Sequence, residues 1–410
     1  MSEKMKDSGV DWIGEIPEGW EVSKIKYVAE LDPVKSEIIR ENFIGKKVTF
    51  LPMDKLKKGH LILDSVADFI EVFSSYNYFA EGDILFAKVT PSFENGNIGI
   101  AKNLRNGIGF GSSEIYTLRA HNIDTNFLYY WLQNQQFKSE AVSNMYGVAG
   151  LKRVPAEFIK NHVILLPISR VDQKAVADYL DKQTSKFDQA QKLLKDEIER
   201  LRAYKKSLIY ETVTKGLDKN VQFKDSGVDW IGEIPVGWEV VSLKNIVQIK
   251  NGREIEKSVN KGYPVYGSGG VFKYTDKYLY DGESVLLGRK GTIDNPQYVT
   301  GKFWTVDTSY YTISSGRLCT KLFYYQSLLF DYQFFQTGST LPSMTQKDLG
   351  LIKLPFPENL LKQEKLVEYL DRKIDIIDKI IKIKGEQFTN LSEQCKTLIY
   401  EVVTGKRKVK

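Results

Sequence analysis

The chain has 410 residues, with 58 basic and 52 acidic side chains, a formal net charge of +6 and 42% hydrophobic residues. This balance is typical of a globular protein of two or three domains and excludes disordered and collagen-like chains. No run approaches the roughly 18 apolar residues of a membrane span. The N-terminus lacks the apolar core of a signal peptide. We therefore expect a cytoplasmic protein that has no membrane partner.

Metal and cofactor chemistry has little support in the composition. Cys319 and Cys395 are too few for a disulfide framework or a Cys-rich zinc site. The three histidines show no HExxH-type spacing. We expect no metal, no cofactor and no catalytic residues. The charge is also too mild to coat nucleic acid by itself, although it allows a local basic face.

Two nearly identical segments divide the chain. Residues 6–22 read KDSGVDWIGEIPEGWEV, and residues 224–240 read KDSGVDWIGEIPVGWEV. The second segment begins 218 residues after the first, and only Glu18 and Val236 differ between them. Such self-similarity indicates an internal duplication.

Weaker matches follow in the same order. Residues 79–85 resemble residues 200 positions later, and residues 113–118 resemble residues 195 positions later. Gln173 and residues 179–181 recur 190 positions later, as do residues 208–214. Because these spacings fall steadily along the chain, we infer two copies of one fold, the second of which has shorter loops.

The body of each copy has the signals of a mixed domain. In chain order, we expect strands at 48–51 and 84–87, a helix at 126–138, a strand at 285–287 and a helix at 321–334. Gly, Asn, Asp and Pro bound the short β-rich runs, as is typical of turns. Each body is therefore predicted to be a small α+β domain with a curved or barrel-like sheet.

Both closing segments carry a heptad pattern, which predicts a coiled coil. The apolar positions are Leu180, Phe187, Leu194, Leu201 and Leu208 in the first segment, and Leu370, Ile377, Leu391 and Leu398 in the second. Ser185 and Asp375 are helix-capping residue types at equivalent positions, so each helix either restarts there or runs unbroken. Residues 384–385, a lysine and a glycine, predict a weak point in the second helix.

The predicted fold class is α+β. Two tandem α/β heads, residues 1–171 and 217–361, are separated by a long antiparallel coiled coil with pseudo-two-fold symmetry. The helical segments are residues 172–216 and 362–410. B-DNA presents equivalent grooves about a local two-fold axis, so inverted heads suit two half-sites on opposite strands. The composition alone does not prove that DNA is the ligand.

The chain resembles the specificity subunit of type I restriction–modification enzymes. The paired GVDWIGEIPxGWEV segments at 9–22 and 227–240 carry this resemblance, together with the repeated Leu-Pro, Gln and Tyr-Leu-Asp passages. Residues 81–91 and 280–292 also look like stretches of that family's target-recognition domains.

The resemblance implies that each head is a target-recognition domain that binds one half of a bipartite, asymmetric site in double-stranded DNA. It implies that the helices set the spacing and dock two modification subunits, which use S-adenosylmethionine to methylate adenine. Restriction subunits then complete the nuclease. In this family the specificity subunit itself catalyses nothing.

Groove readers and phosphate anchors are expected in polar, glycine-flanked loops. The candidates in the first head are Lys88, Thr90, Ser92, Asn95, Ser112, Ser113, Lys152 and Arg153. The candidates in the second head are Ser268, Arg289, Lys290, Thr292, Ser339 and Thr340. Lys88 is expected to occupy the place that the basic loop at 288–292 has in the second head.

Two other functions are a catalytic enzyme and a protein adaptor. An adenine methyltransferase needs an Asn/Asp-Pro-Pro-aromatic loop, and residues 294–297 lack the second proline and the aromatic residue. The chain also lacks the clustered carboxylates and lysine of a metal-dependent nuclease. The remaining alternative is a coiled-coil adaptor for proteins, with two peptide-binding heads. Salt-dependent, sequence-specific retention of DNA would exclude that alternative.

Overall fold

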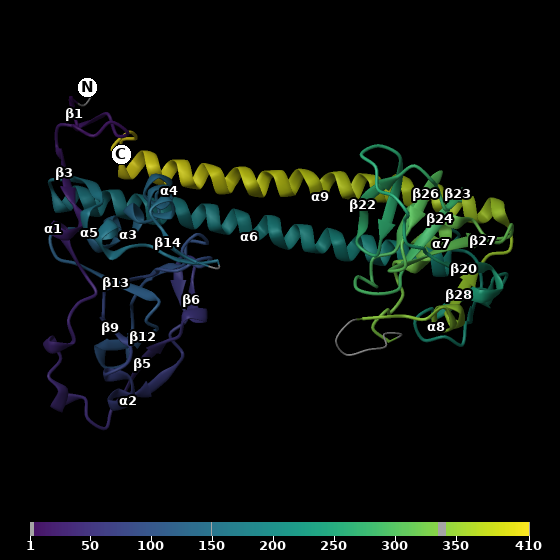
Figure 1. The fold of residues 1–410 in the computed structure, drawn as a ribbon, viewed down its shortest axis with the longest axis horizontal. Coiled ribbons are helices and arrows are strands. Elements are labelled where there is room, and N and C mark those ends of the chain that lie inside the picture. The colour runs from purple at the N-terminus through teal and green to yellow at the C-terminus, as the bar shows by residue number, and fades with distance from the viewer. Residues whose placement is uncertain (1–3, 149, 335–341, 410) are drawn as a thin grey trace. The chain divides into compact units, whose positions relative to one another are not determined.

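The computed structural model describes residues 4–148, 150–334 and 342–409. It divides into two compact units (Figure 1). Unit 1 consists of Met1–Leu193 and Gln387–Lys410, and unit 2 of Leu194–Glu386. Each unit holds one head and part of both long helices, α6 (Arg170–Lys215) and α9 (Leu360–Val403). Among the described residues, no helix combines the length and apolar character required to cross a bilayer.

The head of unit 1 contains two four-stranded sheets, with strand orders β11-β10-β13-β4 and β8-β5-β12-β9. The strands are β4 (Ala29–Leu31), β5 (Lys47–Leu51), β8 (Val66–Asp68), β9 (Asn77–Ala80), β10 (Ile84–Ala87), β11 (Ile98–Ile100), β12 (Ile108–Gly111) and β13 (Ile115–Ala120). Every residue of β10 is buried, which explains its continuous apolar run. β12 pairs in parallel with β5, and the other pairs are antiparallel.

The head of unit 2 repeats this topology, with orders β25-β24-β27-β20 and β22-β21-β26-β23. The strands are β20 (Val247–Asn251), β21 (Tyr263–Gly267), β22 (Gly270–Thr275), β23 (Tyr280–Asp281), β24 (Ser284–Gly288), β25 (Gln297–Val299), β26 (Lys302–Thr305) and β27 (Ser309–Ser314). Its one parallel pair among these strands, β21 with β26, corresponds to β5 with β12. The duplication is confirmed, although each head has two sheets in place of the single curved sheet expected.

Short strand pairs complete both heads. The pairs that correspond between the heads are β1 (Met5–Asp7) with β2 (Glu15–Pro17) and β17 (Phe223–Asp225) with β18 (Glu233–Pro235), then β3 (Trp20–Lys24) with β16 (Val163–Pro167) and β19 (Glu239–Ser242) with β28 (Lys353–Phe356). The first head also has the pairs β6 (Leu56–Lys57) with β7 (His60–Leu61) and β14 (Tyr146–Val148) with β15 (Leu151–Arg153). The repeated entry segment therefore forms a hairpin, followed by a strand that pairs with the last strand of its head.

The short helices differ from the expected ranges. The segment expected as one helix at 126–138 forms α3 (Thr125–Trp131) and α4 (Gln135–Ser143). The Asn134 side chain accepts a hydrogen bond from the Phe137 N–H and so caps a new helix. In the second head α7 ends at Ser327, well before residue 334. The remaining helices are α1 (Ile25–Val28), α2 (Phe69–Phe73), α5 (Ala156–Asn161) and α8 (Gln346–Leu351).

The two long helices run unbroken, so the restart considered at residues 185 and 375 does not occur. The break expected at residues 384–385 is also absent. Lys384, which interrupts the apolar seam, extends its Nζ to 2.5 Å from the Glu197 carboxylate on α6. α9 therefore continues through Gly385, although a helical glycine costs roughly 1 kcal/mol relative to alanine.

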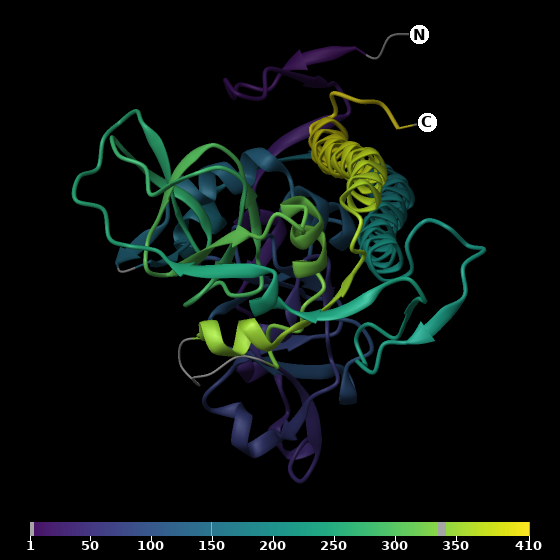
Figure 2. The same cartoon turned by 90° about the vertical axis from the view of Figure 1, so that its right-hand side faces the viewer.

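The helices pair in opposite directions within each unit. In unit 2, Glu197 meets Lys384, while Lys205, further along α6, meets Asp378, earlier in α9, at 2.8 Å. Residues of early α6 and late α9 share one core cluster in unit 1. The end-on view in Figure 2 shows the two coils side by side. The predicted antiparallel arrangement therefore holds inside each unit, and the α+β fold class is confirmed.

Burial of the heptad residues follows the position of the heads. Leu180 and Leu398 are buried in unit 1, and Leu208, Leu370 and Ile377 in unit 2. The positions nearer the middle of the helices are only half-buried, and they are Phe187, Leu194, Leu201 and Leu391. The heptad side chains are therefore most fully buried where a head also packs on the helices.

The repeated glutamine explains how each head docks on its helix. Gln173 Oε1 accepts from the Asp124 N–H at 2.7 Å, and Gln173 Nε2 donates to the Pro167 carbonyl at 2.8 Å. Gln363 makes the same two contacts in unit 2, with the Cys319 N–H and the Pro357 carbonyl, both at 2.7 Å. Both glutamines are at most 1% exposed. Each therefore ties the start of a long helix to its head.

The repeated aspartate makes a second tie. The Tyr130 hydroxyl on α3 donates to Asp181 on α6 at 2.5 Å. The Tyr325 hydroxyl on α7 donates in the same way to Asp371 on α9. Burial and the neighbouring carboxylate raise the pKa of both tyrosines, so both hydroxyls keep their protons at neutral pH.

The glutamine tie generates a prediction about stability. Gln173→Leu removes the partners of the partly buried Asp124 N–H and of the buried Pro167 carbonyl, so it should lower the free energy of unfolding of unit 1 by roughly 2–4 kcal/mol. Chemical denaturation of the full chain measures this loss. The matched control is Gln189→Leu, because Gln189 is exposed on the same helix. Equal effects of the two substitutions would contradict this role of Gln173.

Candidate nucleic-acid interface

A cation lies over a tyrosine ring at the same place in both heads. Lys88 follows β10, and its Nζ lies 4.5 Å from the centroid of the Tyr116 ring on β13. Arg289 follows β24, and its guanidinium carbon lies 5.9 Å from the Tyr310 ring on β27. These distances are within the range of a cation–π contact. The predicted match between Lys88 and the loop at 288–292 is thus correct in position.

Backbone contacts support this equivalence. The Tyr116 hydroxyl donates to the Val154 carbonyl at 2.8 Å, and the Tyr310 hydroxyl donates to the Met344 carbonyl at 3.1 Å. In turn, the Val154 N–H donates to the Lys88 carbonyl, and the Met344 N–H donates to the Arg289 carbonyl. In each head, the cation, the tyrosine and the backbone segment that follows are therefore linked to one another by contacts.

Sequence comparison missed this tyrosine pair by one residue. The spacing of 195 aligns Tyr116 with Tyr311, and the spacing of 200 aligns Lys88 with Gly288. In the structure, Tyr310 and Arg289 occupy these places. The neighbouring Tyr-Tyr dipeptide was the signal that could have identified the contact.

The groups around Lys88 shift the pKa of its ammonium group. Burial lowers the pKa of Lys88 because it removes water from the ammonium group. The carboxylates of Asp32 and Glu114 oppose this effect, and the nearby Arg153 guanidinium adds to it. The site therefore presents a partly desolvated cation, which gains from contact with an anion or a hydrogen-bond acceptor.

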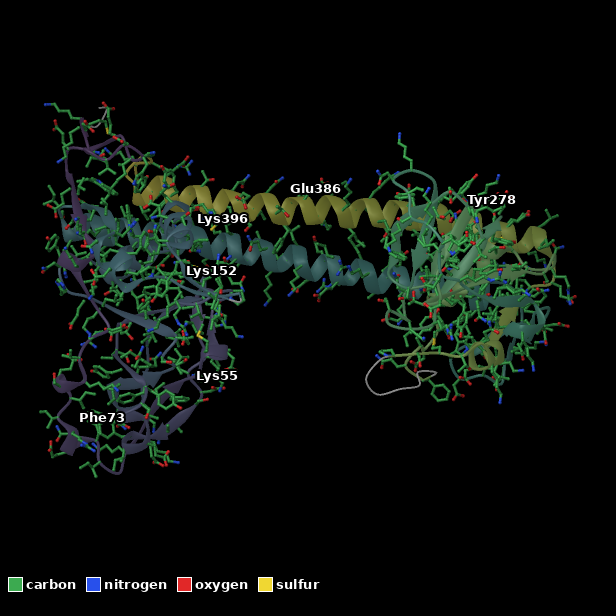
Figure 3. All side chains as sticks on the ribbon, viewed as in Figure 1. Lys55, Phe73, Lys152, Tyr278, Glu386 and Lys396 are labelled. Carbon is green, nitrogen blue, oxygen red and sulfur yellow. The ribbon has the colours of Figure 1, made fainter. Side chains whose placement is uncertain are left out.

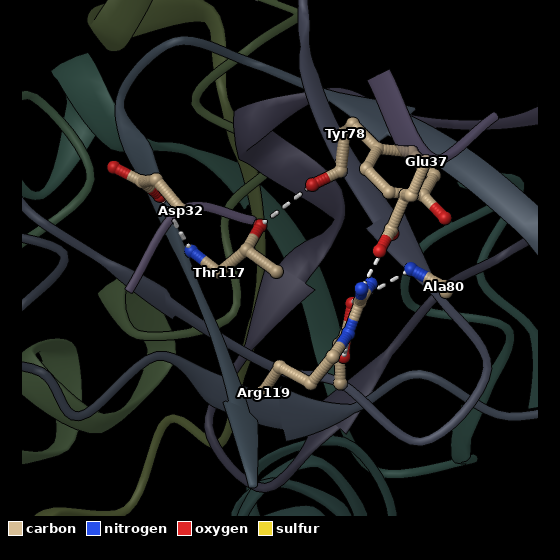
Figure 4. A network of polar contacts seen from close by, with 7 residues as sticks. Asp32, Glu37, Tyr78, Ala80, Thr117 and Arg119 are labelled. Carbon is tan, nitrogen blue, oxygen red and sulfur yellow. Dashed lines mark hydrogen bonds and ion pairs between the residues drawn. The ribbon is translucent and has the colours of Figure 1, made fainter. Parts of the chain in front are cut away.

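A polar network fixes β13 behind Lys88 (Figure 4). Arg119 donates to Asp83 at 2.7 and 2.8 Å and pairs with Glu37 at 2.5 Å. The Thr117 N–H donates to Asp32 at 3.0 Å. Asp83 and Thr117 are buried. This network ties β13, the strand next to Lys88, to the carboxylates of Asp32, Glu37 and Asp83.

The hairpin β14–β15 stands beside Lys88 and is anchored through Gly150 in its turn and through β15. The Thr90 hydroxyl donates to the Gly150 carbonyl at 2.7 Å and accepts from the Lys152 N–H at 2.9 Å. Arg153 makes two hydrogen bonds to Glu114, at 2.8 and 3.1 Å. Thr90 and Arg153, both expected to contact a ligand, therefore also hold the hairpin.

The tip of the hairpin is exposed. Val148 is 84% exposed, Tyr146 61% and Leu151 48%. The Lys152 side chain is exposed beside them (Figure 3). An anchored hairpin with exposed apolar and basic side chains suits insertion into a groove.

The other first-head candidates lie around this centre. Ser112, whose hydroxyl accepts from the Glu114 N–H at 3.3 Å, and the exposed Ser113 belong to the turn between β12 and β13. Because Glu114 contacts both Lys88 and Arg153, these serines share the Lys88 neighbourhood. Ser92 and Asn95 lie in the turn after Thr90, and only Asn95 is exposed.

The second head brings two predicted loops together. Lys290 Nζ lies 3.7 Å from the Asp307 carboxylate, and Arg289 donates to the Asp307 carbonyl at 3.3 Å. Gly291 has a φ of +82°, and a Cβ added there would lie 3.4 Å from the Ser268 hydroxyl oxygen. The exposed Thr292 ends the same loop. Sequence analysis did not identify Asp307 as part of this site.

Two second-head candidates, Ser339 and Thr340, lie outside the described residues. The segment after them is described, and its Pro342 carbonyl accepts from the Gly291 N–H at 3.0 Å. Ser343 forms a β-bridge with Lys290, as Arg153 does with Val89 in the first head. The two heads thus support their basic loops in the same way but present different side chains.

Comparison with known proteins identifies the family. The family described as Type I restriction modification DNA specificity domain matches residues 17–200 and 235–387. The putative type I restriction enzyme MjaX specificity subunit of Methanocaldococcus jannaschii is 25% identical over 97% of this chain and 96% of its own length.

Two curated relatives match locally. The EcoAI and EcoEI specificity subunits of Escherichia coli are each 33% identical, over 37% and 40% of this chain. These alignments span only 26% and 28% of the relatives' own lengths.

Solved structures share the fold. One solved chain comes from work on complex assembly and conformational transition of the type I R-M system. It has a TM-score of 0.76 and 16% sequence identity, over 96% of this chain and 99% of its own length. The HsdS subunit from Thermoanaerobacter tengcongensis has a TM-score of 0.55, with 15% identity over 96% and 98%. With its two matched domains and its duplicated fold, this chain belongs to the type I restriction–modification DNA specificity subunit family.

Proposed function

We propose that this chain selects a bipartite DNA sequence for a type I restriction–modification complex, with each head reading one half-site. The observation that carries this proposal is the matched pair of cation–tyrosine sites, Lys88 on Tyr116 and Arg289 on Tyr310. The two heads share one topology, but the side chains around these sites differ. Equal scaffolds with unequal side chains suit the reading of two different half-sites.

Each head combines groups suited to the two parts of DNA recognition. The exposed Lys152 and the half-buried Lys290 suit phosphate contacts, which fix position on the duplex. Arg289 suits guanine, since an arginine can donate two hydrogen bonds to O6 and N7. Lys88 offers a single ammonium group in its place, so the two heads should prefer different bases.

The long helices are proposed to set the spacing between the half-sites and to dock the methyltransferase subunits. Their unbroken course and their antiparallel pairing within each unit support this role. The half-buried middle positions, such as Leu194 and Leu391, leave apolar surface for such partners. In this proposal the chain does no chemistry, and its modification and restriction partners methylate and cleave.

The first prediction from this proposal concerns half-site discrimination. Mapping the adenines methylated by the chain together with its modification subunits defines both half-sites. Arg289→Ala with Lys290→Ala should then reduce discrimination at one half-site by about 1–3 kcal/mol, roughly 5- to 150-fold in relative affinity, and leave the other unchanged. Lys88→Ala should show the opposite pattern.

Competition binding with duplexes altered in one half at a time measures both effects. Arg317→Ala is the matched control, because Arg317 is an exposed arginine of the second head that pairs with Glu358. Equal losses at both half-sites from either variant would contradict the assignment of one half-site to each head.

The second prediction concerns the hairpin β14–β15. Thr90→Val removes the hydroxyl that holds Gly150 and Lys152, so the Lys152 amide should exchange faster with solvent. Affinity for the half-site read by the first head should fall by about 1 kcal/mol or more. Hydrogen exchange and competition binding check the two effects, and Thr300→Val at an exposed threonine serves as control. Faster exchange without any loss of affinity would exclude the hairpin from DNA contact.

A further inference from the structure

A cavity of about 890 Å³ in unit 1 lies apart from the cation–tyrosine site. The first head lines one side with the segment before β7 and with α3 and α4, while α6 and α9 line the other. Lysines dominate its charged groups, and they are Lys58, Lys102, Lys138, Lys192 and Lys396. The acidic groups on the wall are only Asp181 and Asp188.

Lys138 is the most unusual of these lysines. It lies on α4, and a Cβ added at Gly96 would come within 2.9 Å of its Nζ, so one wall of the group is backbone. Burial, followed by the positive charges of Lys58 and Lys396, lowers the pKa of Lys138 to about 8. No carboxylate among the described residues contributes to that pKa. At neutral pH Lys138 is therefore mostly protonated, and the described residues include no carboxylate in a salt bridge with it.

The nearby acids are committed elsewhere or too few to balance the lysines. Asp181 accepts the Tyr130 hydroxyl and so belongs to the tie between head and helix. Asp188 contributes to the pKa of the Cys395 thiol but not to that of Lys138. On α9, Lys396 pairs at 2.8 Å with Glu393, which does not line the cavity. The cavity thus carries a surplus of positive charge.

We propose that this cavity binds a phosphate group, with Lys138 as its central ligand and Lys58 and Lys396 as flanking ligands. Lysine binds phosphate as a compact point charge with three donors. The three lysines come from three separate segments of the chain that line the same cavity (Lys396 is labelled in Figure 3). A free phosphate and a phosphodiester of the DNA backbone have this chemistry in common.

The first arm of the test uses inorganic phosphate and the full chain. Thermal unfolding is followed at rising phosphate concentration, with chloride adjusted to hold ionic strength constant. The midpoint of the wild-type chain should rise saturably by a few degrees. Lys138→Met should abolish this rise. The control Lys24→Met, at an exposed lysine on β3, should retain it.

The second arm uses a DNA duplex that contains the mapped site, and it rests on the proposed function. If the phosphate belongs to the DNA backbone, Lys138→Met should reduce the slope of log affinity against log salt by about 1 without changing half-site discrimination. Unchanged discrimination separates this site from the base-reading sites. A phosphate response equal in all variants, together with an unchanged salt slope, would overturn the phosphate site.

Discussion

The structure depends on how each head is fastened to the helices. A buried glutamine at the start of each long helix bonds the end of the preceding strand or the residue after it, and also the N-cap residue of α3 or α7. An aspartate two turns later accepts a hydrogen bond from a tyrosine of the same short helix. Because these contacts correspond in the two units, the repeated Gln and Tyr-Leu-Asp passages mark a common docking geometry. Each head therefore has a fixed position on the helix segments of its own unit.

The same scaffold then carries different side chains. The buried strands β10 and β24 each end in a cation over a tyrosine, and each tyrosine hydroxyl holds the backbone that follows the groove loop. In the first head the cation is Lys88 beside an anchored hairpin. In the second head Arg289 and Lys290 share Asp307. Duplication explains the common frame, and the side chains that differ at these few positions support the proposal that each head reads a different half-site.

Much of the fold could be predicted from the sequence because its repeated segments reveal the duplication. The repeated entry segments, the strand at 84–87 and the antiparallel helices were expected from spacing and heptads, and the structure has them. Sequence analysis missed the helix cap at Asn134, although it is a local contact to the Phe137 N–H three residues later. It also missed the intact helix at Gly385, where the contact of Lys384 with Glu197 on the other helix is tertiary. The polarity of Thr90 predicts a ligand contact, yet its hydroxyl bonds the backbone of the hairpin. The sequence does not indicate this long-range contact.

The central claim is that the two long helices pair in opposite directions and carry the heads. A short bis-maleimide cross-linker tests it in a Lys205→Cys/Asp378→Cys chain that also has Cys319→Ser and Cys395→Ser. Lys205 and Asp378 are in contact at 2.8 Å, so mass spectrometry should find α6 and α9 joined at these positions. Absence of this product, together with a cross-link between position 205 and native Cys395 in a Lys205→Cys chain, would indicate parallel helices and contradict the account.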